Sequence, residues 1–129
     1  MKLLLDTHIW IWSLLRPDKL APRVVRQLGS AEVHLSPISV WEALLLIEKK
    51  RIVVKGSADD WVTRALAVGP FHEAPLTFEV AAESRRLRID HQDPADRFIA
   101  ATAKVYDLTL VTADEHLLRA PGFRHLANR

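Results

Sequence analysis

Acidic residues recur along this chain where a strand is predicted to end or a helix to begin. They are Asp6, Glu42, Asp93, Asp96 and Asp114. Ligands of α/β sheets bind in the crevice at the carboxyl ends of the strands, so these acids can converge on one edge of a sheet. Carboxylates gathered in one cleft repel each other unless they are protonated or neutralised by a cation. The acids therefore predict a cation site.

The available ligand atoms indicate which cation this site would take. The chain has no cysteine, and its six histidines lack the paired spacing of a zinc site. A ligand set of oxygen atoms favours a hard divalent ion, Mg²⁺ or Mn²⁺, over zinc. Such ions keep open positions for water and phosphate oxygens, the arrangement used to cut phosphodiesters.

Each acid also has an ordinary structural explanation. Ser39 and Glu42 have the spacing of a capping box. Asp93 is a natural N-cap before a proline, and Asp96 suits the positive end of the same helix. Asp114 can cap the short helix that follows it. Taken singly, the acids favour these structural roles, whereas their joint placement favours a site.

The elements that must position the acids alternate between strand and helix. The continuous apolar run 3–5 is typical of a strand buried on both faces of a parallel sheet, and further strands are predicted at 32–35, 71–76, 108–112 and 123–126. Helices are predicted from residue 7 onward and over 20–28, 38–50, 57–68, 77–87, 93–106 and 114–118. This order predicts an α/β fold of three layers, with a mainly parallel central sheet flanked by helices.

The composition fits one globular domain with its own core, since the 129 residues are 49% hydrophobic and 26% charged. No apolar run approaches the roughly 20 residues of a membrane-spanning helix, and no signal-type cleavage region opens the chain. We therefore expect a soluble protein, and the absence of cysteine fits a reducing cytoplasm. The net charge of +2 permits nucleic-acid binding without demanding it.

Basic and aromatic residues supply secondary candidates. Three basic runs occur, Lys49–Arg51 with Lys55, Arg85 with Arg86 and Arg88, and Arg16 with Lys19, Arg23 and Arg26. Solvated helix ends are their default interpretation, but a run that borders the acidic cleft could hold a phosphate backbone. Trp12 and Trp41 are predicted to be core or interface anchors, with base stacking as the weaker alternative.

Four short motifs occur in a fixed order along the chain. They are LLDTH at 4–8, SVWE at 39–42, HQDPADR at 91–97 and LVTAD at 110–114. Together they resemble the PIN-domain ribonucleases, and specifically the VapC-like toxins of bacterial type II toxin–antitoxin pairs. The resemblance runs from residue 3 to about 118, and it implies a compact α/β/α PIN fold, which we expect to form one domain over residues 1–129.

The resemblance also implies an activity and the residues that carry it. The family consists of Mg²⁺- or Mn²⁺-dependent endoribonucleases in which metal-activated water attacks an RNA phosphodiester. Asp6, Glu42, Asp96 and Asp114 align with the acidic cluster that binds the metal and performs catalysis. Asp6 and Asp96 resemble the firmest ligands, while Glu42 and Asp114 complete the site directly or through water.

Two further residues and the partners follow from the same resemblance. Thr112 resembles the hydroxyl that orients the site, and Asp93 matches a common family residue, although helix capping is kept as its main role. VapC-like proteins usually dimerise and are silenced by a cognate antitoxin of VapB type whose tail occupies the cleft. We therefore expect an RNA substrate, an antitoxin partner, and a homodimer or hetero-oligomer in the cytoplasm, without a membrane association.

Two other functions stay open at this point. One is a PIN-type nuclease that acts in RNA processing or on DNA, which would use the same acidic site. The other is a PIN-fold protein-binding module whose acids are structural, motivated by the apolar helices around Trp12 and Trp41. The sequence does not specify the RNA target or the number of metal ions.

Overall fold

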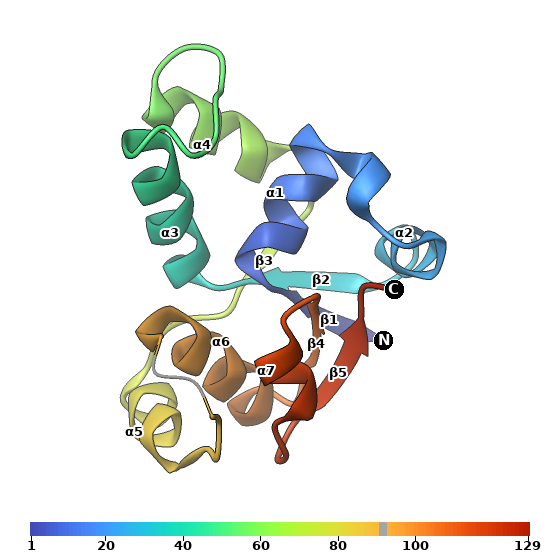
Figure 1. Ribbon diagram of the computed structural model, residues 1–129, viewed down its shortest axis with the longest axis vertical. Helices are drawn as coiled ribbons and strands as arrows, with labels where there is room; N and C mark the ends of the chain where they lie inside the picture. The colour runs from blue at the N-terminus through green and yellow to red at the C-terminus, as the bar shows by residue number, and fades with distance from the viewer. Residues whose placement is uncertain (91–92) are drawn as a thin grey trace.

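The fold is a parallel sheet between two groups of helices, in a computed structural model that describes residues 1–90 and 93–129. The strands are β1 (Lys2–Leu5), β2 (Glu32–Leu35), β3 (His72–Glu73), β4 (Thr109–Thr112) and β5 (Arg124–Ala127). The helices are α1 (Thr7–Leu15), the 3₁₀ helix η1 (Pro17–Lys19), α2 (Pro22–Leu28), α3 (Pro37–Glu48), α4 (Ala58–Ala67), α5 (Phe78–Arg86), α6 (Pro94–Val105) and α7 (Glu115–Arg119). The predicted three-layer α/β/α arrangement is confirmed (Figure 1).

The order of the strands creates a reversal in the middle of the sheet. Across the sheet the order is β3-β2-β1-β4-β5, and each neighbouring pair is parallel. The chain therefore moves outward from β1 to β3, then crosses back and adds β4 and β5 on the other side of β1. Such a switch point, here between β1 and β4, is where open α/β sheets form their ligand crevice.

Strand β1 separates two hydrophobic cores. Leu3 and Leu5 face one core, which contains Trp10 and is covered by α1 to α4, while Leu4 faces the other, which contains Ile99 of α6. Successive side chains of a strand alternate between its two faces, so this short apolar run serves both layers. Figure 1 shows α1 to α4 on one side of the sheet and α5 to α7 on the other. Each fully buried leucine stabilises the fold by roughly 2 kcal/mol.

The helix predicted over 38–50 begins within one residue of its expected start, but its cap is not the one considered. The capping box expected at Ser39 and Glu42 is not formed, because α3 begins earlier and its N-cap is Ser36, whose Oγ accepts a hydrogen bond from the Ile38 N–H at 3.1 Å. Pro37 takes the first helical position, where its missing N–H costs nothing. Ser39 and Glu42 consequently lie inside the helix, and their side chains are available for other contacts.

The tryptophans divide differently from the prediction. Trp10 is fully buried in the core, Trp12 is partly buried against it, and Trp41 is 56% exposed. Of the two roles predicted for Trp41, the core role is wrong, because α3 turns Ala43 toward the interior, while the interface role stays a prediction. None of the helices in the described part of the chain combines the length and apolar character needed to cross a membrane.

Candidate metal and catalytic site

The switch point brings the ends of β1 and β4 together. Leu5 pairs in register with Val111, and the Asp6 N–H donates to the Val111 carbonyl at 3.0 Å. The buried Thr112 hydroxyl donates to Asp6 Oδ2 at 2.6 Å, while Asp6 Oδ1 accepts from the Thr7 N–H at 2.9 Å. Both carboxylate oxygens of Asp6 are thus fixed in direction by donors from two neighbouring strand ends.

The buried hydroxyl of Thr7 joins α1 to α3. Thr7 Oγ1 donates to Glu42 Oε1 and lies 2.9 Å from Ser39 Oγ. Thr7 and Ser39 are almost completely buried, whereas Glu42 is half-buried. Because Ser39 and Glu42 are three residues apart on one helix, they share a face, and this face meets the first residue of α1. Glu42 is thereby held beside Asp6.

Two other acids are N-caps of helices that start at the same edge. Asp93 Oδ1 accepts from the Ala95 N–H at 3.0 Å at the start of α6. Asp114 Oδ1 accepts from the His116 and Leu117 N–H groups at 2.8 and 3.3 Å at the start of α7. The predicted capping roles of Asp93 and Asp114 are therefore confirmed.

Asp96 and Arg97 follow in the first turn of α6. Asp96 is half-buried, and Arg97 is 7% exposed. The Arg97 guanidinium donates to the carbonyls of Ser84, Leu87 and Ile89 at 2.9, 2.9 and 3.2 Å. This side chain thus connects the first turns of α6 to residues 84–89, at the end of α5 and just beyond it.

The acids line one cavity of about 370 Å³, which we call the acid cavity. Its lining residues are Asp6, His8, Ile9, Trp12, Glu42, Asp93, Asp96, Ala113 and Asp114. All four predicted metal ligands and Asp93 are thus brought together, and Thr112 lies behind Asp6, where it contacts the carboxylate. His91, which falls in one of the family motifs, lies outside the described residues.

The electrostatics of the acid cavity penalise ionised carboxylates. Burial raises the pKa of Asp6, although the hydrogen bonds from Thr112 and Thr7 lower it. Burial also raises the pKa of Glu42, and the nearby charges of Asp6 and Asp93 add to the increase. A cation among these groups would favour their ionised forms.

The donor chemistry of the acid cavity fits a hard divalent ion. Its titratable lining consists of five carboxylates and one histidine, and the carboxylates supply the oxygen ligands that Mg²⁺ and Mn²⁺ prefer. Within residues 1–90 and 93–129, however, no three such side chains already stand at the spacing of a formed metal site. The cavity therefore offers oxygen donors of the kind that such an ion prefers, without a fully formed ligand set.

Sequence reasoning missed three residues that hold this site in place. Thr7 and Arg97 were part of the motifs but received no individual role, and Ser39 was considered only as a helix cap. The i, i+3 spacing of Ser39 and Glu42 was a usable signal, because it places both side chains on one helix face. The contacts of Arg97 reach carbonyls 8 to 13 residues away, and no local pattern announces them.

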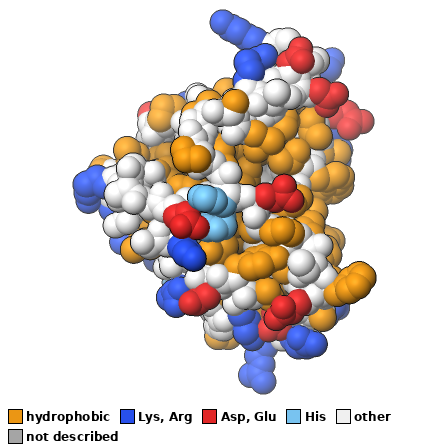
Figure 2. Space-filling model, turned by 180° about the vertical axis from the view of Figure 1, so that it is seen from behind, with side chains coloured by type: hydrophobic (Ala, Val, Ile, Leu, Met, Phe, Trp, Pro, Cys, Tyr) orange, Lys and Arg blue, Asp and Glu red, His pale blue; other side chains and the backbone are white. Residues whose placement is uncertain are grey.

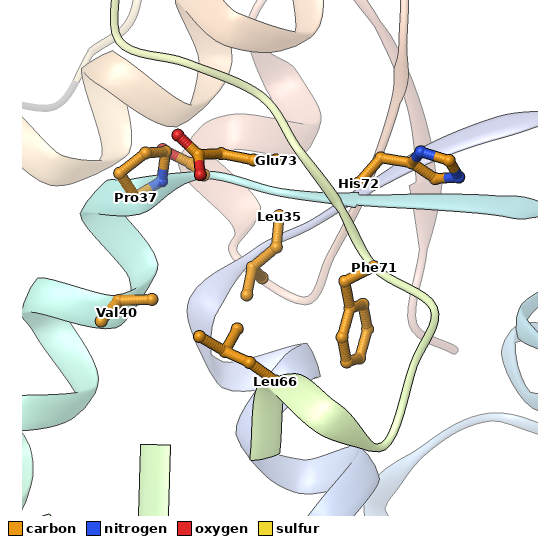
Figure 3. Close-up of a pocket in the computed structure, with 8 residues that line it drawn as sticks. Leu35, Pro37, Val40, Leu66, Phe71, His72 and Glu73 are labelled. Carbon is orange, nitrogen blue, oxygen red and sulfur yellow. The ribbon is translucent and has the colours of Figure 1, made fainter. Parts of the chain in front are cut away.

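A second cavity, of about 350 Å³, lies at the carboxyl ends of β2 and β3 (Figure 3). We call it the apolar groove, and its lining residues are Leu35, Ser36, Pro37, Val40, Leu66, Phe71, His72 and Glu73. Figure 3 shows the side chains of Val40, Leu66 and Phe71 directed toward the same space. On the face seen in Figure 2, hydrophobic side chains gather in broad patches with cations mainly near the outline. Apolar surface is thus exposed outside the acid cavity.

Comparison with known proteins connects this geometry to a family. The PIN domain family model matches residues 3–122. Ribonuclease VapC22 of Mycobacterium tuberculosis is 31% identical over 116 residues, which are 88% of each chain.

Solved structures share the fold. FitAcB from Neisseria gonorrhoeae aligns with a TM-score of 0.65 and 28% identity over 98% of this chain and 96% of that one. VapBC2 from Rickettsia felis, solved with a DNA fragment from its promoter, aligns with a TM-score of 0.74 over 98% of each chain, and at 17% identity this likeness concerns the fold alone. Because the family model and a VapC relative both span most of the chain, it belongs to the PIN-domain family as a VapC-like member.

Proposed function

We propose that this chain is a metal-dependent endoribonuclease and the toxin of a VapBC-type toxin–antitoxin pair. The observation that carries the proposal is the acid cavity, where Asp6, Glu42, Asp96 and Asp114 line one space at the switch point of the sheet. The activity is further supported by the name of a relative with 31% identity, Ribonuclease VapC22. We propose the cytoplasm as its place of action and the whole chain, 1–129, as one PIN domain.

The side chains of the acid cavity would have different roles in binding the metal ion. Asp6 and Asp96 would hold Mg²⁺ or Mn²⁺ most directly, with Glu42 and Asp114 as ligands either directly or through water. When bound, the ion supplies a polarised water and offsets the negative charge that develops on the phosphate. Thr112 keeps the Asp6 carboxylate aimed at the cavity through its 2.6 Å hydrogen bond.

The remaining polar residues position the acids. The Thr7 hydroxyl restrains Glu42 and so orders a long, rotamer-rich side chain before substrate arrives. Asp93 serves chiefly as the cap of α6, and the cap fixes where Asp96 stands one turn into the helix. Preorganised carboxylates lower the entropic cost of ordering the site.

The experiment that tests the activity compares RNA cleavage by the unsubstituted chain with cleavage by Asp6→Asn and Asp96→Asn in Mg²⁺ or Mn²⁺. Each variant should lose more than about 100-fold in kcat/KM, since losing a ligand costs at least as much as losing a group that orients one. Asp59→Asn, on the exposed first turn of α4, is the matched control and should cleave normally. Full cleavage by a folded Asp6 or Asp96 variant would overturn the assignment.

We also infer a partner, an antitoxin of VapB type. The apolar groove offers a protein-binding surface that does not overlap the acids, and Val40 of α3 lines it two residues before Glu42 lines the acid cavity. A partner seated in the groove could therefore extend a tail toward the acids. Co-expression with the product of an adjacent small reading frame, followed by a cleavage assay of the complex, tests this inference.

The alternative functions differ in what they bind. A PIN-type nuclease of RNA processing or of DNA would use the same acids, and parallel assays on RNA and DNA of one sequence separate these substrates. A protein-binding module with structural acids would have no affinity for Mg²⁺ or Mn²⁺ by calorimetry. Sedimentation of the free chain and of the complex would determine whether a homodimer forms.

A further inference from the structure

One wall of the acid cavity carries no acid. It is formed by α1, from which His8, Ile9 and Trp12 line the cavity beside Asp6. The His8 side chain is exposed, whereas the Trp12 side chain is partly buried and packs against the hydrophobic core. The two rings lie 5.9 Å apart between centroids, with an angle of 57° between their planes.

A cation stands against this wall. Lys19 Nζ of η1 lies 5.2 Å from the centroid of the Trp12 ring, within the range of a cation–π contact. Lys19 is itself exposed and does not line the acid cavity. Two rings that line the cavity and a positive charge over one of them, Trp12, are therefore combined along α1 and η1.

The acids alone do not explain how an RNA substrate would be held in the cavity. The acids repel the phosphates of an RNA strand, so substrate must be held by groups other than the acids. Aromatic side chains bind unpaired bases by stacking, and this binding tolerates different sequences because every base has a flat face. A lysine beside the rings adds an attractive contact with the backbone.

An i, i+4 ring pair on a helix also occurs for purely structural reasons. The position of this pair argues for more, because both rings line the same cavity as the acids. The other clear ring contact of α1, between Trp10 and Trp61 at 5.8 Å, is buried in the core and serves packing. Only the pair on the cavity side is placed to meet a ligand.

We propose that an unpaired base next to the cleaved bond stacks on the wall formed by His8 and Trp12, while Lys19 contacts a phosphate of the same strand. The inference rests on the proposed ribonuclease function and deepens it. It makes a single-stranded segment the preferred substrate, because the bases of a duplex already stack on each other. Trp12 and Lys19 bind and position the RNA, and the acids perform the chemistry.

The test measures RNA binding in a background that does not cleave. The full chain carrying Asp96→Asn is titrated in Mg²⁺ with an unpaired RNA oligonucleotide and with its duplex form. Adding Trp12→Leu keeps apolar bulk against the core but removes the aromatic face, and it should weaken binding of the unpaired RNA about 10-fold. Adding Trp12→Phe keeps a stacking face and should bind within about 2-fold of the background.

Lys19 is tested separately. Lys19→Gln should reduce the slope of log Kd against log salt by about 0.7, the value for losing one phosphate contact on a single strand. Phe78→Leu removes an aromatic face that is 97% exposed and outside the acid cavity, and Lys55→Gln removes an exposed charge. Neither control should change binding.

A set of RNAs with one abasic position each distinguishes stacking from a general packing defect. One of these RNAs lacks the base that would stack on Trp12. For this RNA, Trp12→Leu and Trp12→Phe should bind equally well, whereas for the other RNAs the difference in binding between the two variants should persist. Equal binding by Trp12→Leu and Trp12→Phe, a penalty that no abasic position removes, or no binding of unpaired RNA at all would overturn the proposal.

Cleavage by the unsubstituted chain provides the separate readout for the proposed function. If the chain cleaves no RNA while the Trp12→Leu and Trp12→Phe variants still differ in binding, the stacking wall stands and the nuclease assignment falls. If the chain cleaves RNA and the two variants bind alike, the nuclease assignment stands and the wall falls.

Discussion

The acid cavity and the apolar groove lie at the same edge of one sheet, but carboxylates predominate in the lining of the first and apolar side chains in that of the second. Their volumes are similar, about 370 and 350 Å³, and α3 borders both, through Glu42 in one and Val40 in the other. At the acid cavity the residue after the strand is Asp6, whereas at the groove β2 is followed by Ser36 and a proline. The parallel topology thus creates crevices at the strand ends, and the first residue beyond each strand determines what the crevice can bind.

The largest effect on the acid cavity is expected from removing the Thr112 hydroxyl, which donates to Asp6. Thr112→Val keeps the shape of the buried side chain but removes the donor to Asp6 Oδ2 and the acceptor for the Asp114 N–H. We expect kcat/KM for RNA and the affinity for Mn²⁺ to fall about 10- to 100-fold, the usual cost of losing a group that orients a ligand. Steady-state kinetics and calorimetry measure both quantities.

Thr112→Ser is the control, because it retains the hydroxyl and should keep most of the activity. Binding of a protein partner at the apolar groove should not change in either variant. Unaltered cleavage by a folded Thr112→Val protein would mean that Asp6 does not depend on this hydrogen bond.

A charge in the apolar groove should affect partner binding alone. Leu66 is 40% exposed and lines the groove, so Leu66→Asp should leave the fold intact and weaken an antitoxin complex by about 10-fold or more. Pull-down and calorimetry of the complex measure the loss, and RNA cleavage by the free chain should stay unchanged. Val53→Asp, at an 86% exposed position outside the groove, is the matched control. Equal weakening by the two variants would show that the groove has no special role.

The buried charge of Asp6 should make the metal-free protein sensitive to pH. Because burial raises the pKa of Asp6, the folded state holds this proton more tightly than the unfolded state does. The contribution of the Asp6 proton to the free energy of unfolding is fully present below the ordinary aspartate pKa, and it is lost as the pH rises through the raised folded-state pKa. At neutral pH with a chelator, Asp6→Asn should be more stable than the unsubstituted chain by on the order of 1 kcal/mol.

Urea unfolding at acidic and neutral pH measures this difference, which should shrink on acidification. Saturating Mg²⁺ should reverse its sign, because only the unsubstituted chain gains stability from binding the ion. A difference that does not depend on pH would contradict an origin in the Asp6 charge.

The smallest effects are expected at Asp93, where two variants distinguish a helix cap from a metal ligand. Asp93→Asn preserves the cap of α6, because asparagine is as good an N-cap as aspartate, and should leave both stability and cleavage nearly unchanged. Asp93→Ala should lower the free energy of unfolding by about 1 kcal/mol. Thermal unfolding and cleavage of both variants test this, and loss of cleavage in a stable Asp93→Asn protein would make Asp93 a ligand.

The layers of the fold and the convergence of the acids on one cavity were predictable, because both depend on local patterns. The apolar run of β1, the Asp93 cap and the helices predicted from 57 and 77 are recognisable from neighbouring residues alone, and the structure contains them. The capping box considered for Ser39 and Glu42 does not form, and it was open to consideration because Ser36 and Ser39 both precede an apolar helical pattern. Pro37 decides between them, since proline favours the first helical position.

Thr112 was expected to orient the site through the family resemblance, but the supports supplied by Thr7 and Arg97 could not be predicted, because they are contacts between distant residues. The Thr7 hydroxyl donates to Glu42, which is 35 positions away in the sequence. Arg97 donates to the backbone carbonyls of Ser84 and Leu87, and no local sequence pattern predicts contacts of this kind. The exposure of Trp41 was missed for a similar reason, since an apolar helix pattern does not reveal which side another layer will cover. Local signals thus identified the acids but not what holds them.

The hydrogen bond between Thr112 and Asp6 has a consequence for the time at which activity can appear. It joins residues 106 positions apart, and Asp6 takes its place only when β4 has paired with β1. A nascent chain that still lacks β4 contains β1 to β3 and the helices up to α6, but it has neither the Thr112 donor nor Asp114. The acid cavity is therefore completed only after nearly the whole chain has left the ribosome, and a truncated product would lack the completed cavity.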